Sequence, residues 1–183
     1  LQHTTLQNYA IGVDFADFDS LLAAYLADLR NQVLAITGGR LGAFRSLNPE
    51  TGDGVWHPTV PCTVVSLLEG GCIEKGLSYH EGGPVYHVFS PHIGGLADTV
   101  NSLYAIKKLV FDDRRVTFAE LMAILRENWE GYEPLRQIAL NKYVYYGNDN
   151  PEVDGIAAAV LDAFAAFCSE NDGKSPVKFP AGV

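Results

Sequence analysis

Three histidines lie close together in the sequence, at His80, His87 and His92. Because histidine is the commonest metal-binding side chain, the trio could be read as a metal centre. Their spacings of seven and five residues match no standard set of zinc ligands. His87 falls in a strand-like run, whereas His80 and His92 fall in turn-like segments. Isolated surface histidines explain the three equally well.

Two glycines, Gly94 and Gly95, directly precede a helical stretch and raise a second alternative, a phosphate-binding loop. The segment lacks both the Lys-Ser/Thr pair of a nucleotide loop and the G-x-G-x-x-G spacing. We expect these glycines to allow tight packing between a strand and a helix. A basic cluster further along is typical of a solvated helix end, where cations favour the helix dipole; it comprises Lys107, Lys108, Arg114 and Arg115.

Candidates for contact with a small molecule are Tyr86, His87 and Glu69. Side chains alternate along a strand, so Tyr86 and His87 are expected on opposite faces and cannot both meet one ligand. Glu69 ends an apolar stretch, where a carboxylate is costly to bury without a partner. Structural alternatives stay open: Tyr86 as a core aromatic with its hydroxyl bonded to the backbone, and Glu69 as a solvated or ion-paired carboxylate.

Several short motifs follow one another along the chain in a specific order. They are Cys72-Ile73-Glu74-Lys75-Gly76, Gly82-Gly83-x-x-Tyr86, Gly94-Gly95-Leu96-Ala97-Asp98, the lysine-rich stretch Ala105 to Phe111, and Tyr146-Gly147-Asn148-Asp149 before a helix. In this order they resemble a segment of the glycyl radical enzymes, the pyruvate formate-lyase superfamily. The likeness covers about the last two thirds of the chain.

This resemblance implies a fold class and a domain organisation. Glycyl radical enzymes are built on a ten-stranded α/β barrel, so the chain is expected to be an α/β, mostly helical fragment of a barrel of pyruvate formate-lyase type. It would come from the C-terminal half of the barrel domain. Residues 1–183 would then form a partial barrel domain that lacks the catalytic-cysteine region and the glycyl radical domain.

The tetrapeptide Gly71-Cys72-Ile73-Glu74 resembles the family's catalytic loop, whose cysteine becomes a thiyl radical and whose glutamate serves as base. Its context is different, because an apolar helix precedes it and Lys75-Gly76 follows it. This context matches a non-catalytic Cys-Ile-Glu that many members carry further along. We therefore expect Cys72 to be a small apolar residue packed on a helix, and a catalytic pair of Cys72 and Glu74 stays as the alternative.

The family also requires an Arg-Val-x-Gly-Tyr loop that stores the radical, and this sequence contains none. The chain alone is therefore expected to be inactive. Its full-length parent would perform radical cleavage or elimination on a small organic substrate, by acyl transfer, dehydration, decarboxylation or related lysis. The alternative is a free-standing helical binding or scaffolding module without catalysis.

The resemblance also implies partners and cofactors. The parent's glycyl radical would be installed by a radical S-adenosylmethionine activating enzyme, and the parent would form a homodimer. This segment itself is expected to bind no metal or organic cofactor. Its first partner would be the remainder of the parent polypeptide.

Composition limits the other classes of partner. The formal net charge of the 183 residues is −9, which disfavours nucleic acid or an anionic membrane as partner. No apolar run approaches the roughly 20 residues that span a bilayer. Cys62, Cys72 and Cys168 form no C-x-x-C pair, which favours reduced thiols. A soluble, cytoplasmic protein is expected.

The elements that must position these residues follow from periodicity and from helix signals. An amphipathic helix with an acidic start is expected from Asp14 to Leu34, and a long loop from Thr37 to Pro61. Gly70 and Gly71 suggest the close approach of another backbone. The remaining elements are a helix over 63–75, a strand over 84–90, and helices over 97–111, from Thr117 to Trp129 behind a capping box, near Pro134, and from Asn150 to Cys168.

Overall fold

The computed structural model describes residues 14–41, 46–47, 54–55, 62–172 and 177–182. The chain divides into two compact units. The first combines Leu1–Leu29 with Gly95–Ala163, and the second combines Arg30–Gly94 with Phe164–Val183. The long helices α2 (Phe18–Leu41) and α8 (Pro151–Ser169) contribute residues to both units.

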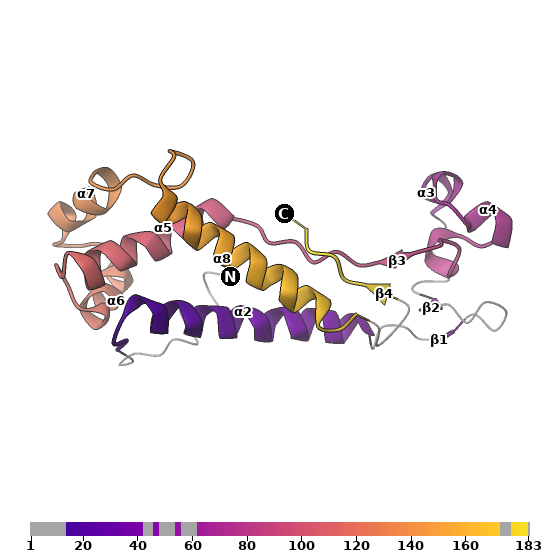
Figure 1. Cartoon of the computed structure of the whole chain (residues 1–183), viewed down its shortest axis with the longest axis horizontal. Coiled ribbons are helices and arrows are strands. Elements are labelled where there is room, and N and C mark those ends of the chain that lie inside the picture. The colour runs from indigo at the N-terminus through magenta and orange to yellow at the C-terminus, as the bar shows by residue number, and fades with distance from the viewer. Residues whose placement is uncertain (1–13, 42–45, 48–53, 56–61, 173–176, 183) are drawn as a thin grey trace. The chain divides into compact units, whose positions relative to one another are not determined.

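Helices are the only regular elements among the described residues of the first unit (Figure 1). Besides the first part of α2 and most of α8, it contains α5 (Leu96–Ile106), the π-helical segment η2 (Lys107–Asp112), α6 (Phe118–Arg126) and α7 (Glu133–Asn141). One apolar cluster forms around the buried residues Leu109, Leu121 and Ala139. It ties η2, α6 and α7 together by hydrophobic contact.

Local sequence signals account for where these helices begin. Asp17 accepts a hydrogen bond from the backbone N–H of Ser20 (2.8 Å) and so caps α2. The predicted capping box is confirmed, since the N–H of Glu120 donates to Thr117 Oγ1 and the N–H of Thr117 donates to the Glu120 carboxylate. Pro134 lies in the first turn of α7 and Pro151 begins α8, as predicted.

The prediction of a loop from Thr37 onward is wrong at its beginning, because α2 continues to Leu41. Thr37 is fully buried and its hydroxyl bonds to the carbonyl of Val33, while Asn171 donates to the same hydroxyl (2.7 Å). Arg30 also makes a two-point contact with Glu170. The contact of Asn171 with Thr37 lies beyond Leu34, the expected end of the helix, and stabilises the extension. Residues 42–45, 48–53 and 56–61 of the expected loop lie outside the described residues.

The second unit contains short elements. They are α3 (Thr63–Leu68), α4 (Cys72–Lys75), the 3₁₀ turn η1 (Tyr79–Glu81), an antiparallel pair of β1 (Ser46–Leu47) with β2 (Gly54–Val55), and a parallel pair of β3 (His87–Val88) with β4 (Val177–Lys178). His87 pairs with Val177 in register, and a further parallel bridge joins His92 to Gly182. The C-terminal segment therefore runs beside the predicted strand.

Two predicted elements of this unit differ from the structure. The single helix expected over 63–75 is broken into α3 and α4, because Gly71 adopts a left-handed conformation (φ 97°). The strand expected over 84–90 is reduced to His87–Val88. The expectation of a mostly helical α/β chain is confirmed for the described residues. Among these residues no helix is both long enough and apolar enough to span a bilayer.

Candidate functional site

A hollow of about 470 Å³ brings together two of the residues singled out in the sequence. It is lined by Glu69, Gly70, Tyr79, Val85, Tyr86 and Val88. Its wall is largely apolar and aromatic, and Glu69 supplies the one carboxylate. Hollows of this composition are typical of small-molecule sites, in which few polar groups orient an otherwise apolar ligand.

Backbone hydrogen bonds fix the two walls of this hollow against each other. The N–H of Val85 donates to the carbonyl of Gly70 (2.9 Å), so the segment after α3 is joined directly to the segment before β3. Lys75 reaches from α4 and donates to the carbonyls of Gly82 (3.1 Å) and Pro84 (3.2 Å). The lysine thus holds the turn that delivers Val85 and Tyr86 to the hollow.

Two glycines allow this close approach. A Cβ at Gly71 would lie 2.8 Å from the carbonyl oxygen of Gly83, and a Cβ at Gly83 would lie 2.3 Å from that of Leu77. Contacts this short do not occur between real side chains and backbone, so both positions require glycine. The predicted approach of another backbone to the Gly70-Gly71 pair is therefore confirmed.

Tyr86 and His87 lie on opposite sides of the chain, as the strand alternation predicts. Tyr86 is 73% exposed and lines the hollow, whereas His87 is 4% exposed and does not line it. Of the three candidate binding residues, the structure brings Glu69 and Tyr86 together and separates His87 from them.

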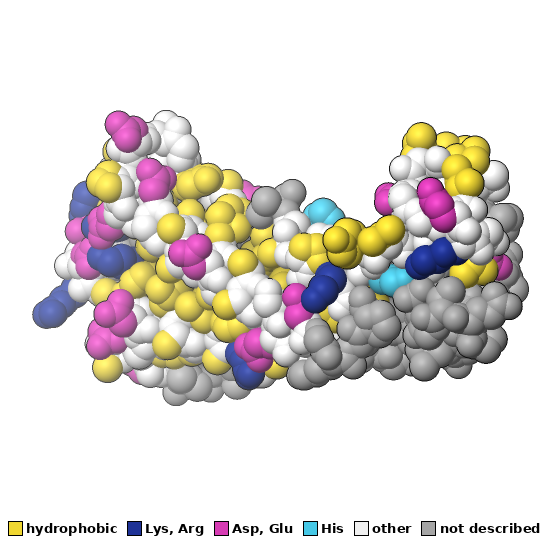
Figure 2. Space-filling model, turned by 45° about the vertical axis from the view of Figure 1, so that its right-hand side comes forward, with side chains coloured by type: hydrophobic (Ala, Val, Ile, Leu, Met, Phe, Trp, Pro, Cys, Tyr) yellow, Lys and Arg dark blue, Asp and Glu magenta, His cyan; other side chains and the backbone are white. Residues whose placement is uncertain are grey.

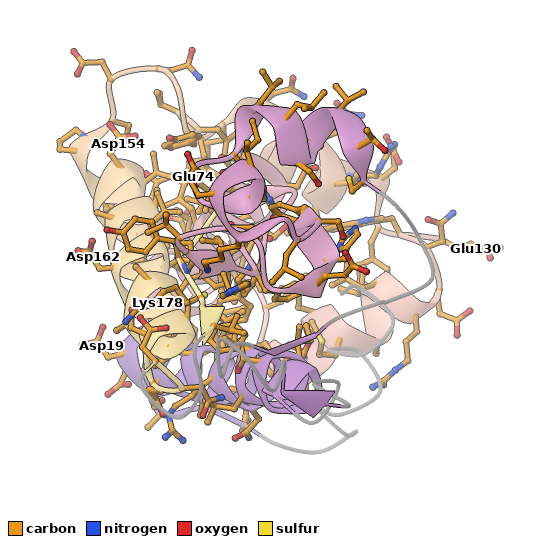
Figure 3. All side chains as sticks on the ribbon, turned by 90° about the vertical axis from the view of Figure 1, so that its right-hand side faces the viewer. Asp19, Glu74, Glu130, Asp154, Asp162 and Lys178 are labelled. Atoms are coloured by element: carbon orange, nitrogen blue, oxygen red, sulfur yellow. The ribbon has the colours of Figure 1, made fainter. Side chains whose placement is uncertain are left out.

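The Cys72 and Glu74 side chains have local structural partners. Cys72 is 3% exposed, and its burial, followed by the nearby Glu69 charge, raises the pKa of the thiol. Glu74, labelled on α4 in Figure 3, accepts a hydrogen bond from the backbone N–H of Gly71 (3.0 Å) and caps that short helix. A buried neutral thiol beside a capping carboxylate fits the packed, non-catalytic interpretation.

An apolar face surrounds the hollow on the outside. Figure 2 shows hydrophobic side chains gathered over the part of the second unit that contains α3. Its most exposed large members are Leu68 (83%), Tyr86 (73%) and Val64 (72%), joined by Leu67, Ile73, Val85 and Val88. Exposed apolar side chains gathered in this way are typical of an interaction surface. Within the chain itself no residue of α3 is buried.

The other candidate sites have no support in the geometry. Among the described residues, no three His, Cys, Asp or Glu side chains lie close enough together to hold a metal ion. Gly95 adopts a left-handed conformation at the start of α5, and a Cβ at Gly94 would contact nothing within 4 Å. The expected tight strand-to-helix packing at Gly94 is therefore wrong.

The basic cluster is paired rather than simply solvated. Lys107 and Lys108 each contact both Asp112 and Glu152, at distances between 2.6 and 3.0 Å. These hydrogen bonds lower the pKa of Glu152, so its carboxylate stays ionised. The network joins η2 to the first turn of α8. Glu152 lies far along the chain from the lysines, so sequence reasoning had no signal for the pairing.

A comparison with family models identifies the family of the chain. The model described as pyruvate formate lyase-like matches residues 48–179, which include the hollow and most of the described helices. The chain belongs to this family of glycyl radical enzymes. The resemblance drawn from the short motifs is confirmed.

Individual relatives of this pyruvate formate lyase-like chain support the same family assignment. It is 31% identical over 132 residues to a (2S)-3-sulfopropanediol dehydratase from Klebsiella oxytoca, covering 72% of the chain and 16% of the relative. It is 35% identical over 105 residues to a trans-4-hydroxy-L-proline dehydratase from Clostridioides difficile, covering 57% and 13%. A solved glycyl radical enzyme from Archaeoglobus fulgidus matches with a TM-score of 0.69 and 25% identity, covering 94% of the chain and 21% of that structure. The chain thus spans about a fifth or less of these relatives.

Proposed function

We propose that this chain is a segment of a glycyl radical enzyme whose full-length parent eliminates water from a small hydroxylated substrate by radical chemistry. The observation that carries the proposal is the similarity to two dehydratases, together with the family match over residues 48–179, which include the hollow. Among the reactions that the family resemblance implies, these relatives favour dehydration over acyl transfer and decarboxylation.

In the parent the segment forms part of the ten-stranded α/β barrel. The parallel pairing of β3 with β4 supports this, because a two-stranded parallel sheet is not stable alone and needs further strands beside it. The apolar face over α3 supports it too, since the remainder of the parent polypeptide would cover that face and exclude water.

Glu69 and Tyr86 contact the substrate in this proposal. The Glu69 carboxylate accepts a hydrogen bond from a substrate hydroxyl, and the Tyr86 ring packs against the carbon skeleton. His87, which is buried on the opposite side of the strand, does not contact the substrate in this proposal. Cys72 and Glu74 hold the turn and take no part in the reaction.

The radical itself belongs to other parts of the parent. A glycyl radical, installed by a radical S-adenosylmethionine activating enzyme, supplies the hydrogen-atom abstraction that starts the reaction. The parent acts as a homodimer. The chain of 183 residues, which has no Arg-Val-x-Gly-Tyr motif, is inactive by itself.

The test begins with the coding sequence around this chain. A reading frame that continues to an Arg-Val-x-Gly-Tyr motif, expressed without oxygen together with an activating enzyme, should give a glycyl radical signal by electron paramagnetic resonance. It should also dehydrate a small diol. Glu69→Gln and Tyr86→Ala, which removes the ring, should raise KM, whereas Glu130→Gln, at an exposed acid outside the hollow (Figure 3), should not.

Two outcomes would overturn the proposal. One is a gene with natural termini at Leu1 and Val183 and no radical signal, which favours the free-standing binding module. The other is an activated parent in which the substitutions at Glu69 and Tyr86 leave KM unchanged. That result would refute the substrate role of the hollow but would leave the family assignment unchanged.

A further inference from the structure

Three tyrosine rings meet in the first unit, apart from the hollow. Tyr104 lies on α5, and Tyr143 and Tyr145 follow α7. Their ring centroids are 6.1, 6.4 and 6.4 Å apart, and every pair is arranged edge to face. These three residues, here called the tyrosine cluster, form a closed triangle in which each ring touches the other two.

Two of the three hydroxyls point at carboxylates. The hydroxyl of Tyr143 donates to Asp113 (2.9 Å), and that of Tyr104 donates to Glu152 (3.2 Å). The hydroxyl of Tyr145 donates instead to the backbone carbonyl of Ala139. A carboxylate can take up a proton and a backbone carbonyl cannot at neutral pH, so Tyr143 and Tyr104 differ chemically from Tyr145.

Lysines lie over the same two rings. Lys108 Nζ is 5.2 Å from the centroid of Tyr104, and Lys142 Nζ is 5.4 Å from that of Tyr143. A nearby ammonium disfavours a positive charge on the ring, so loss of an electron must be accompanied by loss of the hydroxyl proton. Burial, followed by the bond to Asp113, raises the pKa of Tyr143 to about 12, so the proton is still present at neutral pH.

We propose that the tyrosine cluster is a site of one-electron oxidation, at which a neutral tyrosyl radical forms on Tyr143 or Tyr104. A metal-complex oxidant in the +3 state takes one electron from the ring and is reduced to the +2 state. The O–H bond breaks, and its proton moves to Asp113 or Glu152. Tyr145, whose hydroxyl faces no base, keeps its electron, and the direct contact of the other two rings lets the radical pass between Tyr104 and Tyr143. The site requires no substrate and is independent of the proposed dehydration.

The experiment uses the 183-residue chain and photogenerated tris(bipyridine)ruthenium(III) as oxidant. Electron paramagnetic resonance measures the tyrosyl radical, and spin trapping with mass spectrometry locates it. We expect the adducts on Tyr104 and Tyr143, a slower reaction in D₂O, and the loss of most of the signal in the double variant Tyr104→Phe with Tyr143→Phe. Tyr132→Phe, at a 49% exposed tyrosine outside the cluster, is the matched control and should keep the signal.

Mapping in the unsubstituted chain keeps the proposal testable even if the double variant folds poorly. Adducts that follow exposure, with Tyr86 and Tyr132 dominant, would overturn it. So would a full signal in a folded double variant. Asp113→Asn gives a further check on the proton acceptor of Tyr143. If Asp113 accepts the proton, the substitution should change the ratio of the reaction rates in H₂O and D₂O. If Asp113 has only a structural role, that ratio should stay the same.

Discussion

Substitution of Gly83 by alanine tests the packing that forms the hollow. The added Cβ would lie 2.3 Å from the carbonyl oxygen of Leu77 and 2.8 Å from both Cys72 Sγ and the carbonyl oxygen of Ser78. Ordinary contact begins at 3.4 Å, so the backbone at Leu77 would have to retreat by about 1.1 Å (3.4 − 2.3). A backbone carbonyl cannot rotate away as a flexible side chain can, so the strain must be relieved by moving a turn.

The expected cost follows from this displacement. Overpacking costs roughly 1–3 kcal/mol, and a shift of this size would also break the hydrogen bond from Gly83 N–H to Ser78 O, worth about 1 kcal/mol. We therefore expect Gly83→Ala to lower the free energy of unfolding by about 2–4 kcal/mol. Urea unfolding measures this loss, and hydrogen exchange should show it first at the amides of Gly83 and Val85.

Gly94→Ala is the matched control for this substitution. A Cβ at Gly94 would meet nothing within 4 Å, and the residue is exposed. Its free energy of unfolding should change by no more than about 0.5 kcal/mol. If Gly83→Ala were equally neutral, the close approach of the two turns would be refuted, and with it the fixed walls of the hollow.

Three further predictions concern the first unit. Gly155→Ala, in α8 with open space around it, should raise the free energy of unfolding by about 0.8–1 kcal/mol, and a decrease in urea unfolding would contradict the open site. Thr117→Ala should cost about 1 kcal/mol by the same assay through loss of the α6 cap, while Thr117→Ser should restore it; equal losses would argue against the cap. Hydrogen bonds from Lys142 and Tyr143 lower the pKa of Asp113 to about 2, so its stabilisation is present above the unfolded value of about 3.9 and is lost as the pH falls toward 2. Thermal unfolding of Asp113→Asn should therefore depend less on pH in that range, and an unchanged pH profile would refute this contribution.

Elements specified by local chemistry could be predicted from the sequence. The reciprocal bonds of Thr117 and Glu120 involve residues three apart, and Pro151 favours the first turn of α8, so each helix start depends on its own neighbourhood. The opposite faces of Tyr86 and His87 also follow from strand geometry alone. The family could be inferred because short motifs kept their order along the chain.

Contacts between segments that lie far apart in the sequence could not be predicted from local patterns. The extension of α2 is stabilised by Asn171, more than a hundred residues from its partner Thr37, and the pairing of β3 with β4 joins His87 to Val177. The break between α3 and α4 also depends on a tertiary contact, because the carbonyl of Gly83 approaches Gly71 too closely for any residue with a Cβ.

The sequence by itself therefore determined the helix boundaries set by caps, the alternation of faces and the family. Tertiary structure alone decided that Glu69 and Tyr86 share a hollow and that Tyr104 meets Tyr143 and Tyr145. The physical reason is range: a cap or a strand alternation acts over a few residues, whereas a hollow or a ring cluster exists only after the backbone has brought separate segments into contact.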